Sequence, residues 1–158
     1  MNIRIPSMIS AIMLAFAPTA SHAVDIDKTL ALTSYSAFKC HVYAAQSQQF
    51  DESTRLFQLG YSRGTKFLEI LEDGVYASEV VNQTVPGVMM SIIQEGLPNE
   101  EFVLGRIYEL TREDAFDDVI KRTSSGLLMP STQWRRDEGA KRARAKALYD
   151  EANCALLK

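Results

Sequence analysis

The only two cysteines of the chain, Cys40 and Cys154, constrain its fold more than any other feature, because they lie more than 100 residues apart. In an oxidising compartment an even pair of cysteines is most often one disulfide. Such a bond would hold the beginning and the end of the fold side by side. On chain-entropy grounds, closing a loop of this length contributes about 4 to 5 kcal/mol to stability.

The first 23 residues have the pattern of a secretory signal peptide. One early cation, Arg4, precedes an apolar run over residues 8–16, and Ser21 and Ala23 are the small residues that a signal peptidase reads. The apolar run is shorter than the roughly 20 residues that cross a bilayer. We therefore expect cleavage after Ala23, the alternative being a retained N-terminal anchor. The mature chain, residues 24–158, would be a single periplasmic domain without a transmembrane segment.

The balance of charge limits the class of partner. The sequence has 17 Lys and Arg residues against 20 Asp and Glu residues, a net charge of −3, and loss of Arg4 would make it −4. A mildly acidic chain has no general electrostatic attraction for nucleic acid or for an anionic membrane. We therefore expect no nucleic-acid partner.

Apolar residues recur three and four residues apart through most of residues 24–158, which is the period of an amphipathic helix. No stretch alternates as a half-buried strand does. Cap and breaker residues divide the pattern into separate helices. The first ends near Gln48, the following ones begin after Asp51, Thr84 and Asn99, and the last runs from about Arg135 to Leu156. The sequence thus predicts an all-α fold, a single-domain bundle of four to five helices in which one disulfide joins the first and last helices.

Three segments leave alternatives open. Residues 75–83 fit either an irregular connection or a short helix. In the fourth helix, Thr111 and Asp114 resemble a capping box, so the helix either breaks there or is buried on different sides along its length. The third helix, with Met89 and Met90, is apolar around most of its circumference. We expect it at the centre of the domain, the alternative being an exposed Met-rich docking surface.

The second helix contains two glycines, Gly60 and Gly64, each of which costs a helix roughly 1 kcal/mol relative to alanine. Both fall on the predicted core-facing side, so the bare backbone is expected to admit a close-packed neighbouring helix. The alternative is a groove for a ligand or a partner's side chain. The last helix also has small residues at helical spacing, which indicate a second close contact. The residues that we expect to share the core-facing side of the second helix are Phe57, Gly60, Tyr61, Gly64, Phe67, Leu68 and Leu71.

The pattern F-x-L-G occurs at residues 57–60 and again at residues 102–105. Four residues are too few to indicate an internal repeat. We interpret the two copies as two similar helix contacts.

Two groups of charged residues are candidate binding sites. Arg63 and Arg106 lie beside glycine and aromatic residues, so they either pair with carboxylates or hold a small anion between helices. Glu109, Glu113 and Asp117 are spaced four residues apart and form an acidic stripe, with Asp114 and Asp118 beside it. The stripe is either a solvated face, a partner of the basic last helix, or an oxygen-rich cation site or carboxylate pair for acid–base work.

Recognisable catalytic and cofactor motifs are missing from residues 24–158. The segment has one histidine, His41, and lacks the spacings of covalent haem, redox C-x-x-C, multi-histidine metal and phosphate-loop sites. Haem held by His41 and Met89 or Met90 is a remote alternative, because a single histidine beside a bundle core is usually structural. We therefore expect no cofactor and no metal.

These exclusions favour an exported, non-catalytic binding protein. We expect it to engage another protein of the envelope, as an inhibitor, an immunity factor or an accessory subunit. The alternatives are a small-anion or cation-binding helical protein and a carboxylate-based hydrolase. An exposed apolar patch would favour the first class, and a closed pocket with convergent polar groups would favour the second.

Overall fold

The computed structural model describes residues 23–72, 85–96 and 98–158. The predicted all-α fold is confirmed, since these residues form helices without a strand and contain only one isolated β-bridge, between Arg122 and Leu128. Residues 1–22, which carry the expected signal peptide, lie outside this part, as do residues 75–83 and the expected cap Thr84. The helices are α1 (Ala23–Gln46), α2 (Phe50–Glu72), α4 (Gly87–Gln94), α5 (Glu100–Ile120) and α6 (Glu138–Glu151), with 3₁₀ turns at Ser131–Gln133 and Cys154–Leu156.

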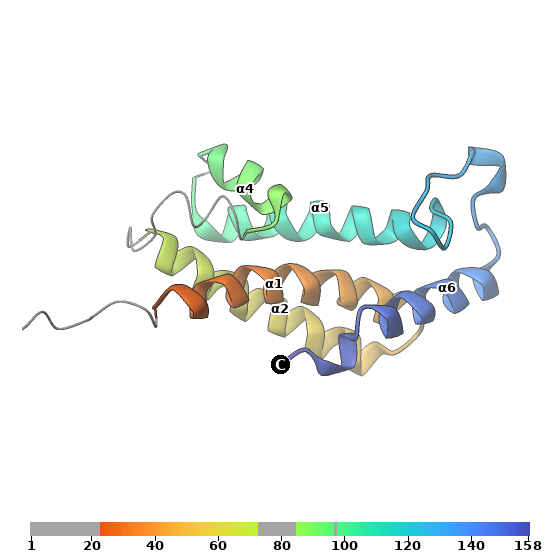
Figure 1. The fold of residues 1–158 in the computed structure, drawn as a ribbon, viewed down its shortest axis with the longest axis horizontal. Coiled ribbons are helices and arrows are strands. Elements are labelled where there is room, and N and C mark those ends of the chain that lie inside the picture. The colour runs from red at the N-terminus through yellow and green to blue at the C-terminus, as the bar shows by residue number, and fades with distance from the viewer. Residues whose placement is uncertain (1–22, 73–84, 97) are drawn as a thin grey trace, which may run out of the picture.

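Helix α1 is the central element of the bundle, and α2, α5 and α6 all pack against it (Figure 1). Its expected apolar stripe is only part of what it buries. Ser34, Cys40 and Tyr43 are buried as well, because partners cover α1 from several sides. A helix in this position needs small or apolar residues around most of its surface.

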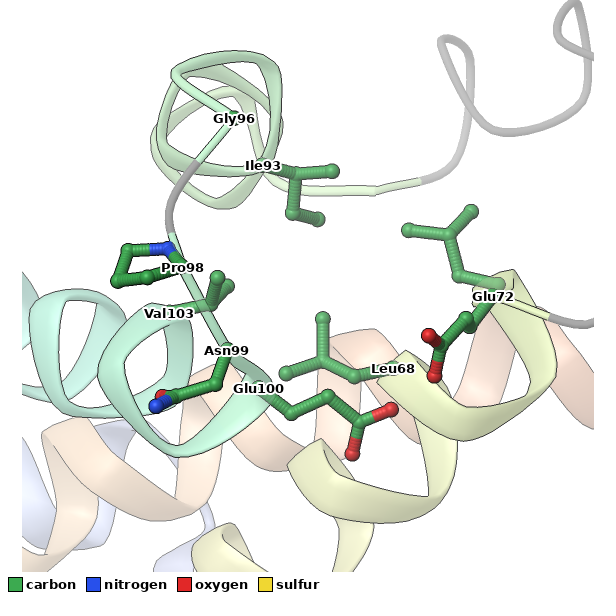
Figure 2. A pocket seen from close by; sticks show the side chains of 9 residues that line it. Leu68, Glu72, Ile93, Gly96, Pro98, Asn99, Glu100 and Val103 are labelled. Atoms are coloured by element: carbon green, nitrogen blue, oxygen red, sulfur yellow. The ribbon is translucent and has the colours of Figure 1, made fainter.

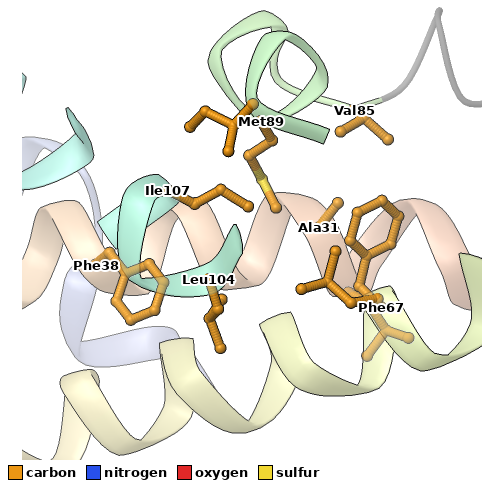
Figure 3. Close-up of a cluster of buried hydrophobic side chains, with 10 residues drawn as sticks. Ala31, Phe38, Phe67, Val85, Met89, Leu104 and Ile107 are labelled. Atoms are coloured by element: carbon orange, nitrogen blue, oxygen red, sulfur yellow. The ribbon is translucent and has the colours of Figure 1, made fainter. Parts of the chain in front are cut away.

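Two hydrophobic clusters fill the bundle. The first joins α1, α2, α4 and α5 around Phe38, Phe67 and Met89 (Figure 3). The second joins α1, α2, α5 and α6 around Cys40 and Leu56. The expectation that α4 would be central is wrong, because this eight-residue helix buries only Met89 and Ile92 fully. It covers the first cluster from one side, with Met89 pointing into it (Figure 3).

The predicted disulfide is confirmed, and the Cα atoms of Cys40 and Cys154 are 5.6 Å apart. Helix α6 is shorter than expected. It begins after Asp137, whose side chain accepts a hydrogen bond from the Ala140 amide, and it gives way to a turn at Asn153, where φ is +53°. Of the small residues expected to form a close contact on the last helix, Ala145 is fully buried against the second cluster.

Helix α5 runs without a break through Thr111, so the expected capping box does not form. The Thr111 side chain is buried, and its hydroxyl donates a 2.7 Å hydrogen bond to the carbonyl oxygen of Ile107, one turn earlier. This bond satisfies the hydroxyl inside the helix. The buried residues of α5 form one continuous stripe of Leu104, Ile107, Thr111, Ala115 and Val119.

Candidate binding surface

Gly60 and Gly64 lie at the closest approach of α2 to α1 and α5. A Cβ atom at Gly60 would lie 2.6 Å from Cδ1 of Phe38, and one at Gly64 would lie 2.7 Å from Oγ of Ser34 and would also overlap Leu104. The Ser34 hydroxyl donates a 2.8 Å hydrogen bond to the carbonyl oxygen of Gly60. Side chains of α1 and α5 thus occupy the space above both glycines, and none is left there for a ligand.

Aromatic side chains of α1, α2 and α5 meet beside this contact. The ring of Phe57 lies 5.2 Å from that of Tyr108 and 6.1 Å from that of the buried Phe38, measured between centroids. Tyr61 stacks on the outer side of Phe57, at 6.4 Å. The side chains of Phe57 and Tyr61 are 36% and 45% exposed, so part of this cluster faces solvent.

The expectation that Phe57 and Tyr61 face the core is wrong. On an ideal helix they lie roughly 60° and 100° around from Gly60, at the shoulder of the buried side. Helix α5 covers this shoulder only in part, through Tyr108. Exposed aromatic residues at such a position are typical of the centre of protein interfaces.

His41 ties the aromatic cluster together. Its Nδ1 atom lies 2.9 Å from both the hydroxyl and the carbonyl oxygen of Ser53, and its Nε2 atom lies 3.2 Å from the Tyr108 hydroxyl. Burial raises the pKa of Tyr108, which keeps the phenol protonated. Within the described residues no carboxylate bonds to His41, so the pair with Ser53 does not extend to a triad. Met89 is fully buried in the first cluster, and Met90 is half-buried beside it.

Helix α5 presents an outward stripe next to Tyr108. Its members, spaced three and four residues apart, are Phe102, Gly105, Glu109, Arg112 and Phe116. Both phenylalanines are exposed, and no atom lies within 4 Å of the position that a Cβ would take at Gly105. Our interpretation of the two F-x-L-G copies as similar contacts is therefore wrong: Gly60 is packed, whereas Gly105 is open. We call Phe57, Tyr61, Phe102, Gly105, Tyr108 and Phe116 the aromatic face.

Arg63 and Arg106 do not converge on a common site. Arg63 is exposed and donates a 3.4 Å hydrogen bond to the carbonyl oxygen of Lys158, on the side of α2 that meets the C-terminal segment. Arg106 is half-buried on α5, and its charge acts on Glu109. The two arginines make no contact with each other in the described part of the chain.

The acidic stripe is largely paired, though not with the basic last helix. Glu109 accepts two hydrogen bonds from Arg112, and these lower the pKa of Glu109. Asp117 pairs with Lys121 at 2.6 Å. Glu113 is exposed beside Phe116 and makes no ion pair among the described residues. Within those residues, no three His, Cys, Asp or Glu side chains gather as metal ligands do.

A charge cluster that sequence reasoning missed joins α1 to α5. The Lys39 ammonium lies 2.9 Å from carboxylate oxygens of both Asp114 and Asp118, and the Tyr43 hydroxyl donates to Asp118 at 2.8 Å. Burial alone would lower the pKa of Lys39, but the hydrogen bonds to the two aspartates outweigh it and raise the pKa. Arg122, just after the end of α5, forms ion pairs with the same two aspartates. The cluster is a structural contact between two helices.

A hollow lies where the end of α2, the end of α4 and the start of α5 meet (Figure 2). Leu68, Ile93 and Val103 form its apolar lining, and the carboxylates of Glu72 and Glu100 approach each other at its rim. Desolvation and the neighbouring Glu72 raise the pKa of Glu100. The hollow is open to solvent, so it does not enclose a small molecule as a ligand pocket does.

No known protein family matches the chain, and no similar characterised protein or solved structure was found. None of the helices in the described ranges is long and apolar enough to cross a membrane.

Proposed function

We propose that the protein is an exported, periplasmic, non-catalytic binding protein that engages another protein of the envelope, as an inhibitor, an immunity factor or an accessory subunit. The aromatic face is the surface that we assign to this contact. Its occupant is an amphipathic helix of the partner that crosses the outward stripe of α5 at Gly105, with its apolar side toward the aromatic face.

Gly105 is the observation that carries this proposal. A glycine inside an exposed helix costs about 1 kcal/mol relative to alanine. At Gly60 and Gly64 the close approach of α1 and α5 offsets the cost, whereas no part of the described chain approaches Gly105. A helix that crosses α5 at this bare backbone could come as close as α1 comes to Gly60.

The residues around Gly105 suit such a contact. Phe102 lies about one turn before it and Tyr108 one turn after it, so a crossing helix would meet an aromatic ring on either side. The ion pair of Glu109 with Arg112 lies along the same stripe and is exposed, where it can pair with polar groups of a partner. Aromatic anchors with a polar margin are the usual composition of an interface.

The other function classes draw less support from the geometry. A small-anion site would need Arg63 and Arg106 to converge, and they do not. A hydrolase would need two carboxylates inside a pocket, and Glu72 and Glu100 lie instead at the rim of an open hollow.

Photo-crosslinking from single positions tests the proposal. A photoreactive phenylalanine analogue would replace Tyr61 or Phe102 on the aromatic face, and Leu32 or Leu156, which are exposed elsewhere, in matched controls. In intact cells we expect one envelope protein to be joined at Tyr61 and Phe102 and not at the control positions. The same crosslink from all four positions, or from none, would contradict the proposal.

A further inference from the structure

The segment between α5 and α6 exposes two adjacent leucines and a tryptophan. Leu127 and Leu128 are 68% and 67% exposed, and the Trp134 ring is partly exposed a few residues later. The segment between α5 and α6 lies with the start of α6 at one end of the molecule, at the right in Figure 1. Adjacent large apolar side chains this exposed are unusual on a protein that functions without a contact there.

This loop is held in one shape by its own hydrogen bonds. The Thr123 amide donates to the carbonyl oxygen of Leu127 at 2.8 Å, and the Met129 amide donates to that of Lys121 at 2.8 Å. Gly126, at φ +82°, makes the turn between them. Leu127 and Leu128 are therefore presented to solvent by a closed turn.

Trp134 is fixed beside the two leucines. Its indole N–H donates a 3.1 Å hydrogen bond to the carbonyl oxygen of Met129, and the ammonium of Lys121 lies 5.2 Å from the centre of its ring. An indole ring with its polar edge bonded and its apolar part partly exposed suits the boundary between water and a membrane.

Some of the basic residues at the same end of the molecule make no ion pair with a carboxylate of the described residues. Arg136 and Arg142 are exposed and make no ion pair within that part of the chain. Arg135 donates to the carbonyl oxygens of Val119 and Arg122, and burial together with the charge of Arg144 lowers its pKa. The Nε–H group of Arg144 is buried without a partner. Arg144 pairs with Glu151 and Lys141 pairs with Glu138, so Arg136 and Arg142 are the exposed cations of this end that no described carboxylate pairs with.

We propose that this end of the protein docks on an anionic phospholipid surface. Leu127, Leu128 and Trp134 would enter the interfacial layer, and Arg136 and Arg142 at the same end would bind lipid phosphates, which guanidinium groups recognise through paired hydrogen bonds. This surface is separate from the aromatic face. Docking here would keep the protein close to the membrane while the aromatic face stays free for its partner.

The single tryptophan of the chain makes the test direct, because all indole fluorescence comes from Trp134. The purified exported protein would be mixed with vesicles of phosphatidylcholine alone or with added phosphatidylglycerol, and binding would be followed by co-sedimentation. We expect binding and a blue shift of the Trp134 emission only with phosphatidylglycerol, and loss of both at high salt.

Paired variants separate the apolar and the charged contributions. The double variant Arg136→Gln, Arg142→Gln should weaken vesicle binding about 30-fold, since each cation near an anionic surface contributes about fivefold. The double variant Leu127→Ser, Leu128→Ser should weaken it about tenfold or more. The matched controls Lys66→Gln with Lys158→Gln, and Leu32→Ser with Leu156→Ser, should bind as the unchanged protein does.

Three results would overturn this proposal. They are no binding to the phosphatidylglycerol vesicles, equal losses in the control variants, and a loss that depends on the arginines but not on the leucines. The last result would mean that the protein adsorbs to the vesicles by charge alone, without entry of the two leucines into the interfacial layer. Phe57→Ser should leave vesicle binding unchanged. Failure of the membrane proposal can therefore be told apart from failure of the proposed protein contact at the aromatic face.

Discussion

Gly60 and Gly105 occupy the same place in two copies of one short pattern, F-x-L-G, but their surroundings differ. The first is covered by the buried ring of Phe38, whereas the second faces open space. Helical periodicity alone could predict the first case, because Gly60 and Gly64 share their side of α2 with buried apolar residues. It could not predict that Gly105 is open, since whether a neighbour covers a helix face depends on the packing of the other helices.

Alanine substitution distinguishes the two glycines. Gly60→Ala should destabilise the protein, because overpacking against Phe38 typically costs 1 to 3 kcal/mol and the gain in helix propensity is only about 1 kcal/mol. Gly105→Ala should instead stabilise it by about 0.5 to 1 kcal/mol. Denaturant midpoints at an unchanged m-value measure both changes. A stabilised Gly60→Ala variant would show that α1 moves enough to make room for the added methyl group.

Glu72 and Glu100 offer a test of charge at the residue scale. The pKa of Glu100 is raised, so its proton is bound more tightly in the folded chain than in the unfolded chain. This contribution to stability is present at acid pH and is lost as the pH rises through the raised pKa. At neutral pH the two carboxylates therefore oppose folding, and Glu72 also lies at the unfavourable C-terminal end of α2.

Glu72→Gln should accordingly raise the free energy of unfolding at neutral pH, and the gain should disappear below about pH 4. Glu69→Gln is the comparison on the same helix: the charge of Glu69 also raises the pKa of Glu100, but less than Glu72 does, and its carboxylate pairs with Lys66 at 3.2 Å, so we expect a smaller gain or none. Urea unfolding at the two pH values measures the difference. An equal gain in both variants would contradict the specific role of the pair.

At the scale of elements, the contact between α1 and α5 shows what helical pattern predicts and what it omits. The period of apolar residues predicted both helices and their burial. It did not predict that Lys39 would meet Asp114 and Asp118, because a pairing between residues this far apart, 75 positions for Lys39 and Asp114, depends on how two helices are rotated against each other. Pairing of the acidic residues of α5 with the basic last helix was one of the alternatives, but the last helix directs Arg144 to the backbone of the loop after α5.

Removal of Lys39 measures this contact. Lys39→Ala would leave Asp114 and Asp118 facing each other, and we expect a loss of about 1 to 3 kcal/mol, allowing for partial exposure of the pair to solvent. Lys146→Ala removes an exposed ion pair with Asp150 on α6 and should change stability by less than about 0.5 kcal/mol. Thermal or denaturant unfolding of both variants provides the comparison. Equal effects would mean that the cluster does not hold α1 to α5.

At the scale of the whole molecule, the two cysteines alone predict that the beginning and the end of the fold lie side by side, and the disulfide between them confirms it. The C-terminal segment is also held by α2, since Arg55 donates to the carbonyl oxygen of Leu157 at 2.8 Å. The binding surface was less predictable. Helical spacing places Phe57 and Tyr61 near a buried side, but their exposure depends on how far α5 covers the edge of that side.

Reduction of the disulfide should lower the free energy of unfolding by about 4 to 5 kcal/mol, because the unfolded chain regains the freedom that the closed loop removed. The denatured, non-reduced protein should contain no free thiol. Denaturant midpoints with and without reductant, together with thiol titration, test both statements. Two reactive thiols, or an unchanged midpoint, would contradict the role of the bond as a link between the first and last parts of the fold.

The central claim is that the bare backbone at Gly105 is kept open for a partner's helix. The variant Gly105→Leu tests it most directly, because leucine favours the helix and its Cβ meets no atom of the described chain. We predict that this variant keeps or raises the stability of the protein while it abolishes the crosslink from Tyr61 to the envelope partner. An unchanged crosslink in the stable variant would contradict the account.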